Sequence, residues 1–201
     1  MEGAKGLVRH FTAKNITTTF HSKLVSLKHT NGGRLVVAEL ESVEEFRREA
    51  SSSILGTTVS EARASAVFEF FVPMDDGWDI DIKESDDLRA CVVVAPMIKP
   101  TLPVAFRSDE LELRSSEGWA RWDEQEEMAS LLAQITPELN RRAVKNVASA
   151  RETARKSIKD FVRTWLLESN QWSDDRFSVI EIKFADEVEE EPPNSEVSPQ
   201  L

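Results

Sequence analysis

The chain reads ARASAVFEFFV from Ala62 to Val72, and this stretch decides the fold. Every second side chain is apolar, small at first and then bulky: Ala62, Ala64, Ala66, Phe68, Phe70 and Val72. Polar residues, among them Arg63 and Glu69, lie between them. A period of two with one apolar face predicts a β-strand in a sheet that is buried on one side. The small residues leave room for a bulky element to lie close against that face.

A strand is also predicted before this stretch. Residues 31–33 read Asn-Gly-Gly, which is typical of a turn because these residues tolerate positive φ. Residues 34–46 follow as an extended segment, in which we expect Val36, Ala38 and Leu40 to share one face.

Two further strands are predicted after it. Residues 75–77 read Asp-Asp-Gly, a hairpin signal, and the return strand places Trp78, Ile80 and Ile82 on one face. Residues 88–95 are apolar almost throughout, which is typical of a central strand covered on both sides. Strands joined in sequence by short turns predict an antiparallel meander. Prolines at 96, 100 and 103 then end the ladder.

The C-terminal half is predicted to be helical. One helix begins near residues 116–118 and reaches Ile135, and a second begins at Pro137 and runs to about Glu168, because Thr-Pro is typical of a helix start. The apolar stripe of the second helix has spacings of three and four: Leu139, Ala143, Val147, Ala150, Ala154, Ile158, Phe161 and Trp165. Residues 176–185 then read as a last strand.

The predicted fold class is therefore α+β. An antiparallel meander sheet is covered by two or three C-terminal helices, and the final strand returns to the sheet. We expect a weakly patterned segment over residues 1–30, a single domain over 31–187 and an acidic tail over 188–201 whose composition is typical of disorder.

Composition limits the partners. The 201 residues carry a formal charge of −11, which disfavours nucleic acid because phosphate binding needs clustered Lys and Arg. No run of apolar residues is long enough to span a membrane, so membrane association is expected only through a segment that this chain lacks. The one cysteine, Cys91, excludes an intramolecular disulfide, and inside a strand it is expected to be an inert core residue.

No metal, cofactor or catalytic site is predicted. The tightest carboxylate group, Asp75, Asp76, Asp79 and Asp81, lacks the spacing of a Ca²⁺ loop and is better explained as a turn followed by a solvated strand face. The three histidines, His10, His21 and His29, lack the spacing of helical metal ligands.

Tryptophans gather in the helical half of the sequence, and the default interpretation is a core between helices and sheet. The alternative is an aromatic contact site for a ligand or partner, with Phe68, Trp119, Trp122 and Trp165 as its candidate residues.

Several short motifs resemble a family of uncharacterised bacterial proteins, in which a domain of unknown function follows an N-terminal membrane helix. The motifs are Gly56-Thr57-Thr58-Val59-Ser60-Glu61, Phe68-Glu69-Phe70-Phe71, Trp78, Ala95-Pro96, Pro100, Pro103, Gly118-Trp119-Ala120-Arg121, Phe161-Val162-Arg163, Trp165-Leu166-Leu167 and Phe184-Ala185-Asp186-Glu187. The resemblance covers about residues 3–187 and implies no activity. It implies a location at the bacterial envelope if a membrane helix was removed, and the cytoplasm otherwise.

We therefore expect a non-catalytic binding or assembly domain whose partner is itself or another protein. One alternative is a protein that binds a small apolar ligand between sheet and helices, near Phe68, Trp119 and Trp165. Another is a hydrolase that uses carboxylates such as Asp79 and Asp81.

Overall fold

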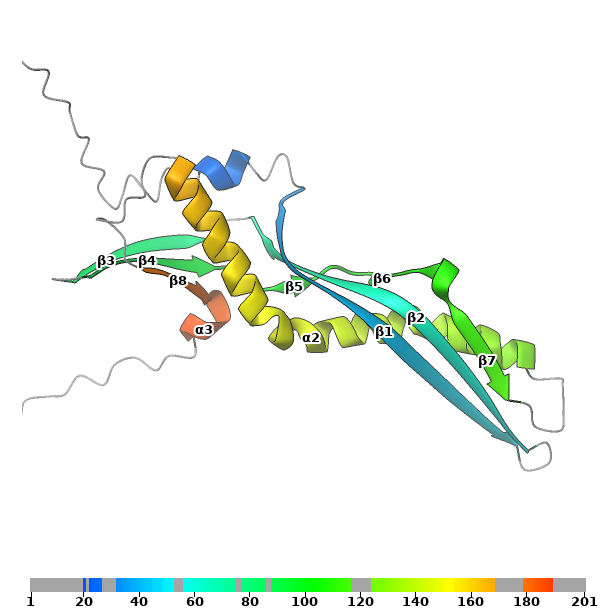
Figure 1. Ribbon diagram of the computed structural model, residues 1–201. Coiled ribbons are helices and arrows are strands. Elements are labelled where there is room, and N and C mark those ends of the chain that lie inside the picture. The colour runs from blue at the N-terminus through cyan, green and yellow to red at the C-terminus, as the bar shows by residue number, and fades with distance from the viewer. Residues whose placement is uncertain are drawn as a thin grey trace, which may run out of the picture. The chain divides into compact units, whose positions relative to one another are not determined.

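The computed structural model describes residues 20, 22–26, 32–52, 56–74, 77–85, 88–116, 124–168 and 179–189. Its elements are shown in Figure 1. In chain order they are β1 (Arg34–Ser52), β2 (Gly56–Pro73), β3 (Asp79–Ser85), β4 (Leu88–Ala95), β5 (Lys99–Pro100), β6 (Ala105–Phe106), a 3₁₀ turn (Ser108–Glu110), β7 (Glu112–Ser116), α2 (Glu124–Glu168), β8 (Val179–Phe184) and α3 (Ala185–Glu189). The α+β class is confirmed.

The chain forms two compact units, which are described separately below. Unit 1 comprises Met1–Leu35, Val72–Met97 and Arg155–Leu201, and unit 2 comprises Val36–Phe71 and Ile98–Ala154. The strands β1 and β2 and the helix α2 contribute residues to both units.

The sheet of unit 2 is built around β2. The strand β1 lies on one side of β2, and the short strands β5, β6 and β7 pair with its other side in antiparallel register. Two further main-chain bonds continue this side: Thr101 N–H donates to Glu69 O at 2.8 Å, and Arg107 N–H donates to Ser65 O at 2.9 Å. Among the residues that the structure describes, β1 is therefore the terminal strand of this sheet.

The core of unit 2 lies between β2 and α2. The alternating row of β2 is buried, from Ala62 at 3% exposure to Phe68 and Phe70 at 0%. The helix buries Leu131, Ile135, Leu139, Ala143 and Ala150. Asn140 Oδ1 of α2 accepts a hydrogen bond of 3.0 Å from Val104 N–H, which ties the helix to the segment beside β2. The burial of the alanine row and of the helix stripe agrees with the predicted packing of a helix on this row.

Unit 1 contains a second sheet with the order β3–β4–β8. The strand β4 is central, as its continuous apolar run predicts; it pairs antiparallel with β3 and parallel with β8. In the same unit, Phe20 contacts Trp78 and Trp165 edge-on, with ring centroids 5.9 Å and 5.0 Å apart. The Trp78 indole N–H donates to Pro73 O at 2.7 Å, so this buried ring has its polar atom satisfied.

Three details differ from the sequence predictions. The expected meander is divided between two sheets, and the last strand returns to β4, with which it pairs in parallel orientation. Only one long helix, α2, is found where two were expected among the described residues, because it continues through Pro137. Proline removes one helical hydrogen bond, but burial of Ile135 and Leu139 on either side holds both halves in one helix. In β1, Val36 is 48% and Leu40 is 42% exposed, whereas the neighbouring Val37 and Ala38 are buried, so the expected shared apolar face is wrong.

The two ends of the sequence are described only in part. Within the weakly patterned N-terminal segment, residues 20 and 22–26 are helical, and at the other end Val188 and Glu189 belong to α3. The rest of the predicted acidic tail lies outside the described residues.

Candidate interaction sites at two strand edges

The strand β8 has an open edge. It is bonded to β4 on one side and, within the described residues, no strand pairs with its other side. Ile182 O accepts a hydrogen bond from Arg155 Nη1 of α2, and Phe184 N–H donates to Glu187 Oε2 at 2.8 Å. In a strand the N–H and C=O of one residue point to the same side, and the next residue points to the other. Ile180, Ile182 and Phe184 therefore direct their main-chain groups to the open edge, and Glu181 and Lys183 direct theirs to β4.

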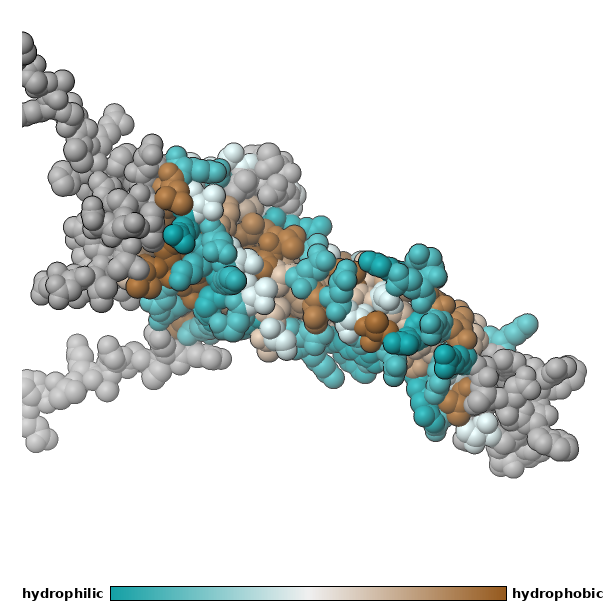
Figure 2. All heavy atoms as spheres, in the orientation of Figure 1, coloured by the Kyte–Doolittle hydropathy of each residue, from teal (hydrophilic) through white to brown (hydrophobic). Residues whose placement is uncertain are grey.

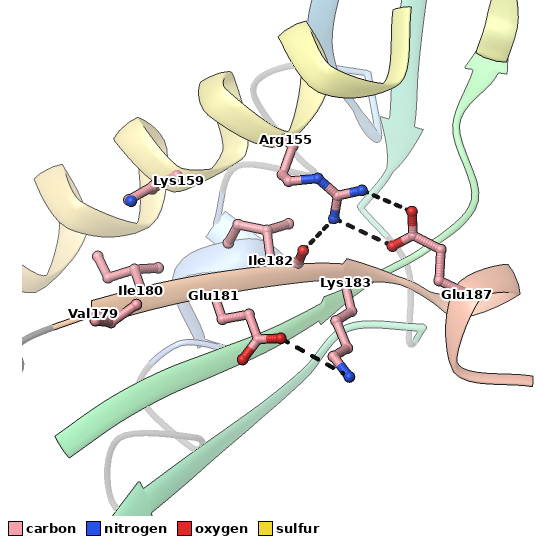
Figure 3. A pocket seen from close by; sticks show the side chains of 8 residues that line it. All are labelled: Arg155, Lys159, Val179, Ile180, Glu181, Ile182, Lys183 and Glu187. Atoms are coloured by element: carbon pink, nitrogen blue, oxygen red, sulfur yellow. Dashed lines mark hydrogen bonds and ion pairs between the residues drawn. The ribbon is translucent and has the colours of Figure 1, made fainter. Parts of the chain in front are cut away.

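A charged pair covers the C-terminal half of this edge. Arg155 Nη2 lies 2.7 Å from Glu187 Oε1, and Arg155 Nη1 lies 3.2 Å from Glu187 Oε2, so the pair is bidentate. The guanidinium carbon also lies 5.2 Å from the centroid of the Phe184 ring. Figure 3 shows Arg155 reaching from α2, and Glu187 from α3, to the end of β8. We call this arrangement the Arg155–Glu187 clamp; it occupies the carbonyl of Ile182 and the amide of Phe184.

The edge also borders a cavity, which extends from the N-terminal half of β8 to the clamp. The cavity has a volume of about 580 Å³ and lies between α2 and β8. It is lined by Arg155, Lys159, Glu187 and the run of β8 from Val179 to Lys183. Lys159 is exposed and lies one helical turn after Arg155, so a positive charge borders the cavity.

Unit 2 contains an arginine with the same set of contacts. Arg142 of α2 donates to the main-chain oxygen of Glu45 at 3.1 Å and to the carboxylates of Glu44 and Glu138. Its guanidinium carbon lies 4.8 Å from the centroid of the Phe46 ring. A main-chain carbonyl of the strand β1 thus accepts a hydrogen bond from a side chain of α2.

The charges around Arg142 shift two pKa values. Burial lowers the pKa of Arg142, but hydrogen bonds and charge from Glu44 and Glu138 together raise it above its ordinary value. The pKa of Glu138 is lowered, first by a hydrogen bond from Arg141 and then by one from Arg142. Both groups are therefore held in their charged forms.

The solvent face of the sheet in unit 2 carries an ordered set of charges. Glu61 of β2 is opposite Arg114 of β7, and Arg63 is opposite Glu112. On the other side of β2, Arg47 Nη1 of β1 lies 3.9 Å from Glu61 Oε1. A shallow cavity of about 270 Å³ is lined by these residues together with Glu45, Phe46 and Ala62. Opposite charges thus face each other across β1, β2 and β7, and we call this set the charge lattice.

The predicted aromatic site is only partly described. Phe68 is 0% exposed in the core of unit 2, and Trp165 is 3% exposed in the core of unit 1. Trp119 and Trp122 lie outside the described residues. Neither Phe68 nor Trp165 lines a cavity that borders β1 or β8. The aromatic ligand site remains a prediction.

The other singled-out residues lie as follows. Cys91 is fully buried in β4, as expected. Asp79 is exposed, and its Oδ1 accepts from Ile80 N–H at 2.9 Å. Asp81 lies on β3, while Asp75, Asp76 and the three histidines fall outside the described residues. In the part of the chain that is described, no group of three or more His, Cys, Asp or Glu side chains could hold a metal ion.

The sequence pattern singled out neither Arg155 nor Lys159, and it gave Glu187 no role in a site. Arg155 belongs to the second predicted helix but not to its apolar stripe, and Glu187 lies 32 residues further along the chain. No local pattern links two residues at that separation, so only the fold identifies the clamp. Figure 2 shows the wider surface, where hydrophobic patches lie among hydrophilic residues on the face drawn.

Fold and site together define an α+β protein in which arginines of one long helix reach the edge carbonyls of β1 and β8. Comparison with known proteins identifies no particular relative: the chain matches no protein-family model, no curated protein and no solved structure. None of the helices in the described ranges is both long and apolar enough to cross a membrane.

Proposed function

We propose that the protein is a non-catalytic binding domain that takes up an extended segment of a protein partner along the open edge of β8. The observation that supports this most is the cavity beside the main-chain groups of Ile180 and Ile182. A strand edge recognises a partner by main-chain hydrogen bonds, and neighbouring side chains select the partner's sequence.

The Arg155–Glu187 clamp limits where the partner pairs. It bonds to Ile182 O and Phe184 N–H, so among the described residues the groups left for a partner are the N–H and C=O of Ile180, the N–H of Ile182 and the second lone pair of Ile182 O. Proteins commonly protect strand edges against indiscriminate pairing with charged groups, and the clamp places two such groups at this edge. The partner strand is therefore short and lies toward the N-terminal end of β8.

Lys159 supplies the selectivity. It is exposed at the border of the cavity, one helical turn from Arg155. A partner segment with an acidic side chain near Lys159 gains an opposite-charge contact, which contributes on the order of 1 kcal/mol or less at an exposed position. We therefore propose an extended acidic segment as the preferred ligand.

The experiment uses displayed random linear peptides selected on the full chain. Selected peptides are expected to be acidic and to bind Lys159→Glu several-fold more weakly than the wild type. The matched control is Lys156→Glu, which makes the same charge change at an exposed position of the same helix that lines none of the cavities described above. It is expected to bind as the wild type does.

Amide hydrogen exchange gives a second measurement that does not depend on a variant. Bound peptide is expected to slow exchange at Ile180 and Ile182 and to leave Glu181 unchanged, because that amide already faces β4. Selection of no binding peptide, or protection confined to residues outside β8, would refute the proposal.

A further inference from the structure

The terminal strand β1 of unit 2 carries a self-complementary run of charges. Residues 44–48 read Glu-Glu-Phe-Arg-Arg, so the signs reverse about Phe46. When this run is paired antiparallel with a copy of itself about Phe46, Glu45 lies opposite Arg47 and Glu44 lies opposite Arg48. Cross-strand pairs of opposite charge stabilise a sheet, and like charges directly opposite destabilise it.

The charge lattice of the sheet has the same arrangement and ends at this run. Across β2 and β7, Glu61 faces Arg114 and Arg63 faces Glu112, and across β1 and β2, Arg47 contacts Glu61. Glu45 and Arg47 are the members of the lattice on β1. A second β1 strand that pairs about Phe46 continues the alternation of charges. Its Arg47 lies beside Glu45 of the first copy, and its Glu45 lies beside Arg47 of the first copy.

The main chain is oriented for this pairing. The carbonyl of Glu45 points to the open edge, since Arg142 of α2 donates to it at 3.1 Å. Arg47 is two residues further along, so its N–H and C=O point to the same edge. A carbonyl oxygen has two lone pairs and can accept from Arg142 and from Arg47 of a second copy together.

We propose that a second copy of this chain pairs with β1 in antiparallel register about Phe46 and joins the two sheets of unit 2 into one. The contact is a two-fold interface, in which the same surface of each copy meets itself. It uses β1 rather than β8, so it is independent of the peptide binding proposed above.

A charge swap tests the interface on the full chain. Sedimentation velocity over a concentration series is expected to show a dimer for the wild type. Arg47→Glu places like charges opposite each other at two symmetric positions and is expected to weaken the dimer about tenfold or more. The double variant Glu45→Arg with Arg47→Glu restores opposite signs and is expected to restore the dimer.

The matched control is Arg114→Glu on β7. It makes the same charge change on the same face and also breaks a lattice pair with Glu61, but it lies away from the β1 edge. It is expected to leave the dimer unchanged. A wild type that stays monomeric, a dimer that is insensitive to Arg47→Glu, or a double variant that fails to recover would each overturn the proposal.

The register is tested by spin labels on Val43→Cys. Val43 is 52% exposed, and the native Cys91 is buried and stays unlabelled. Two copies of residue 43 lie six residue steps apart along the paired strands, which predicts a separation of about 20 Å at roughly 3.4 Å per step. A distance distribution centred well away from this value would refute the register about Phe46.

Discussion

Replacing Arg155 by methionine tests the Arg155–Glu187 clamp. Arg155→Met keeps an unbranched apolar stem but removes the donors to Ile182 O and to the Glu187 carboxylate. Hydrogen bonds to charged groups contribute about 1.5–3 kcal/mol each in net terms. The side chains of Arg155 and Glu187 are 29% and 28% exposed, so water replaces part of what is lost. We expect the free energy of unfolding to fall by about 2 kcal/mol in total, close to the contribution of a single such bond, because water compensates for the others at this partly exposed site.

The assay is urea denaturation followed by tryptophan fluorescence. Trp78 and Trp165 are buried in unit 1, the unit that holds the clamp, and report its unfolding. With a slope of about 2 kcal/mol per molar urea, the expected loss moves the midpoint down by about 1 M. The control is Lys156→Met, an exposed neighbour on α2, whose effect is expected to stay within about 0.5 kcal/mol. If Arg155→Met is no more harmful than Lys156→Met, the clamp contributes nothing to stability and the reasoning is wrong.

Three further changes test the core and the charges of unit 2 by denaturation. Leu139→Ala removes a side chain that is 0% exposed and should cost about 2–5 kcal/mol, whereas Leu132→Ala, at 39% exposure, should cost far less; equal effects would contradict the packing of α2. Ala64→Leu inserts bulk where the alanine row meets α2 and should cost about 1–3 kcal/mol, so a neutral result would mean that the two are not close-packed. The pKa of Glu138 is lower in the folded state than in the unfolded state, so its contribution is complete above the ordinary carboxyl pKa and is lost as the pH falls through the folded value. Glu138→Gln should therefore be less stable than the wild type at neutral pH and equal to it in acid, and a stability difference that persists unchanged into acid would argue against this ion pair.

The elements that the sequence predicts well are those whose burial follows a simple period. The alternation from Ala62 to Phe70 is found as one buried row of β2, because each of these side chains packs on the same face. The continuous apolar run of residues 88–95 forms β4, which is the central strand of its sheet because β3 pairs with one edge and β8 with the other.

Other features depend on contacts that no local pattern contains. Thr136-Pro137 is a typical helix start, yet α2 continues through it because Ile135 and Leu139 are buried on both sides of the proline. In β1 the adjacent Val37 and Ala38 are both buried, so the strand does not keep the single alternation that the residues around Val36 and Leu40 indicated.

The two interaction sites, at the edges of β8 and β1, are less predictable from the sequence than the helices and strands are. Arg155 and Glu187 are brought together only because α3 follows β8 directly and α2 passes beside it. The sign reversal in residues 44–48 is visible in the sequence, but it gains meaning only once β1 is known to be a terminal strand.

The open edge of β8 is tested most directly by residue-resolved amide exchange in the protein without any ligand. The alternation of main-chain directions predicts fast exchange at Ile180 and Ile182, and slow exchange at Glu181, Lys183 and the Glu187-bonded amide of Phe184. Uniform slow exchange from Ile180 to Lys183 would show that the edge is already covered, and would contradict the account.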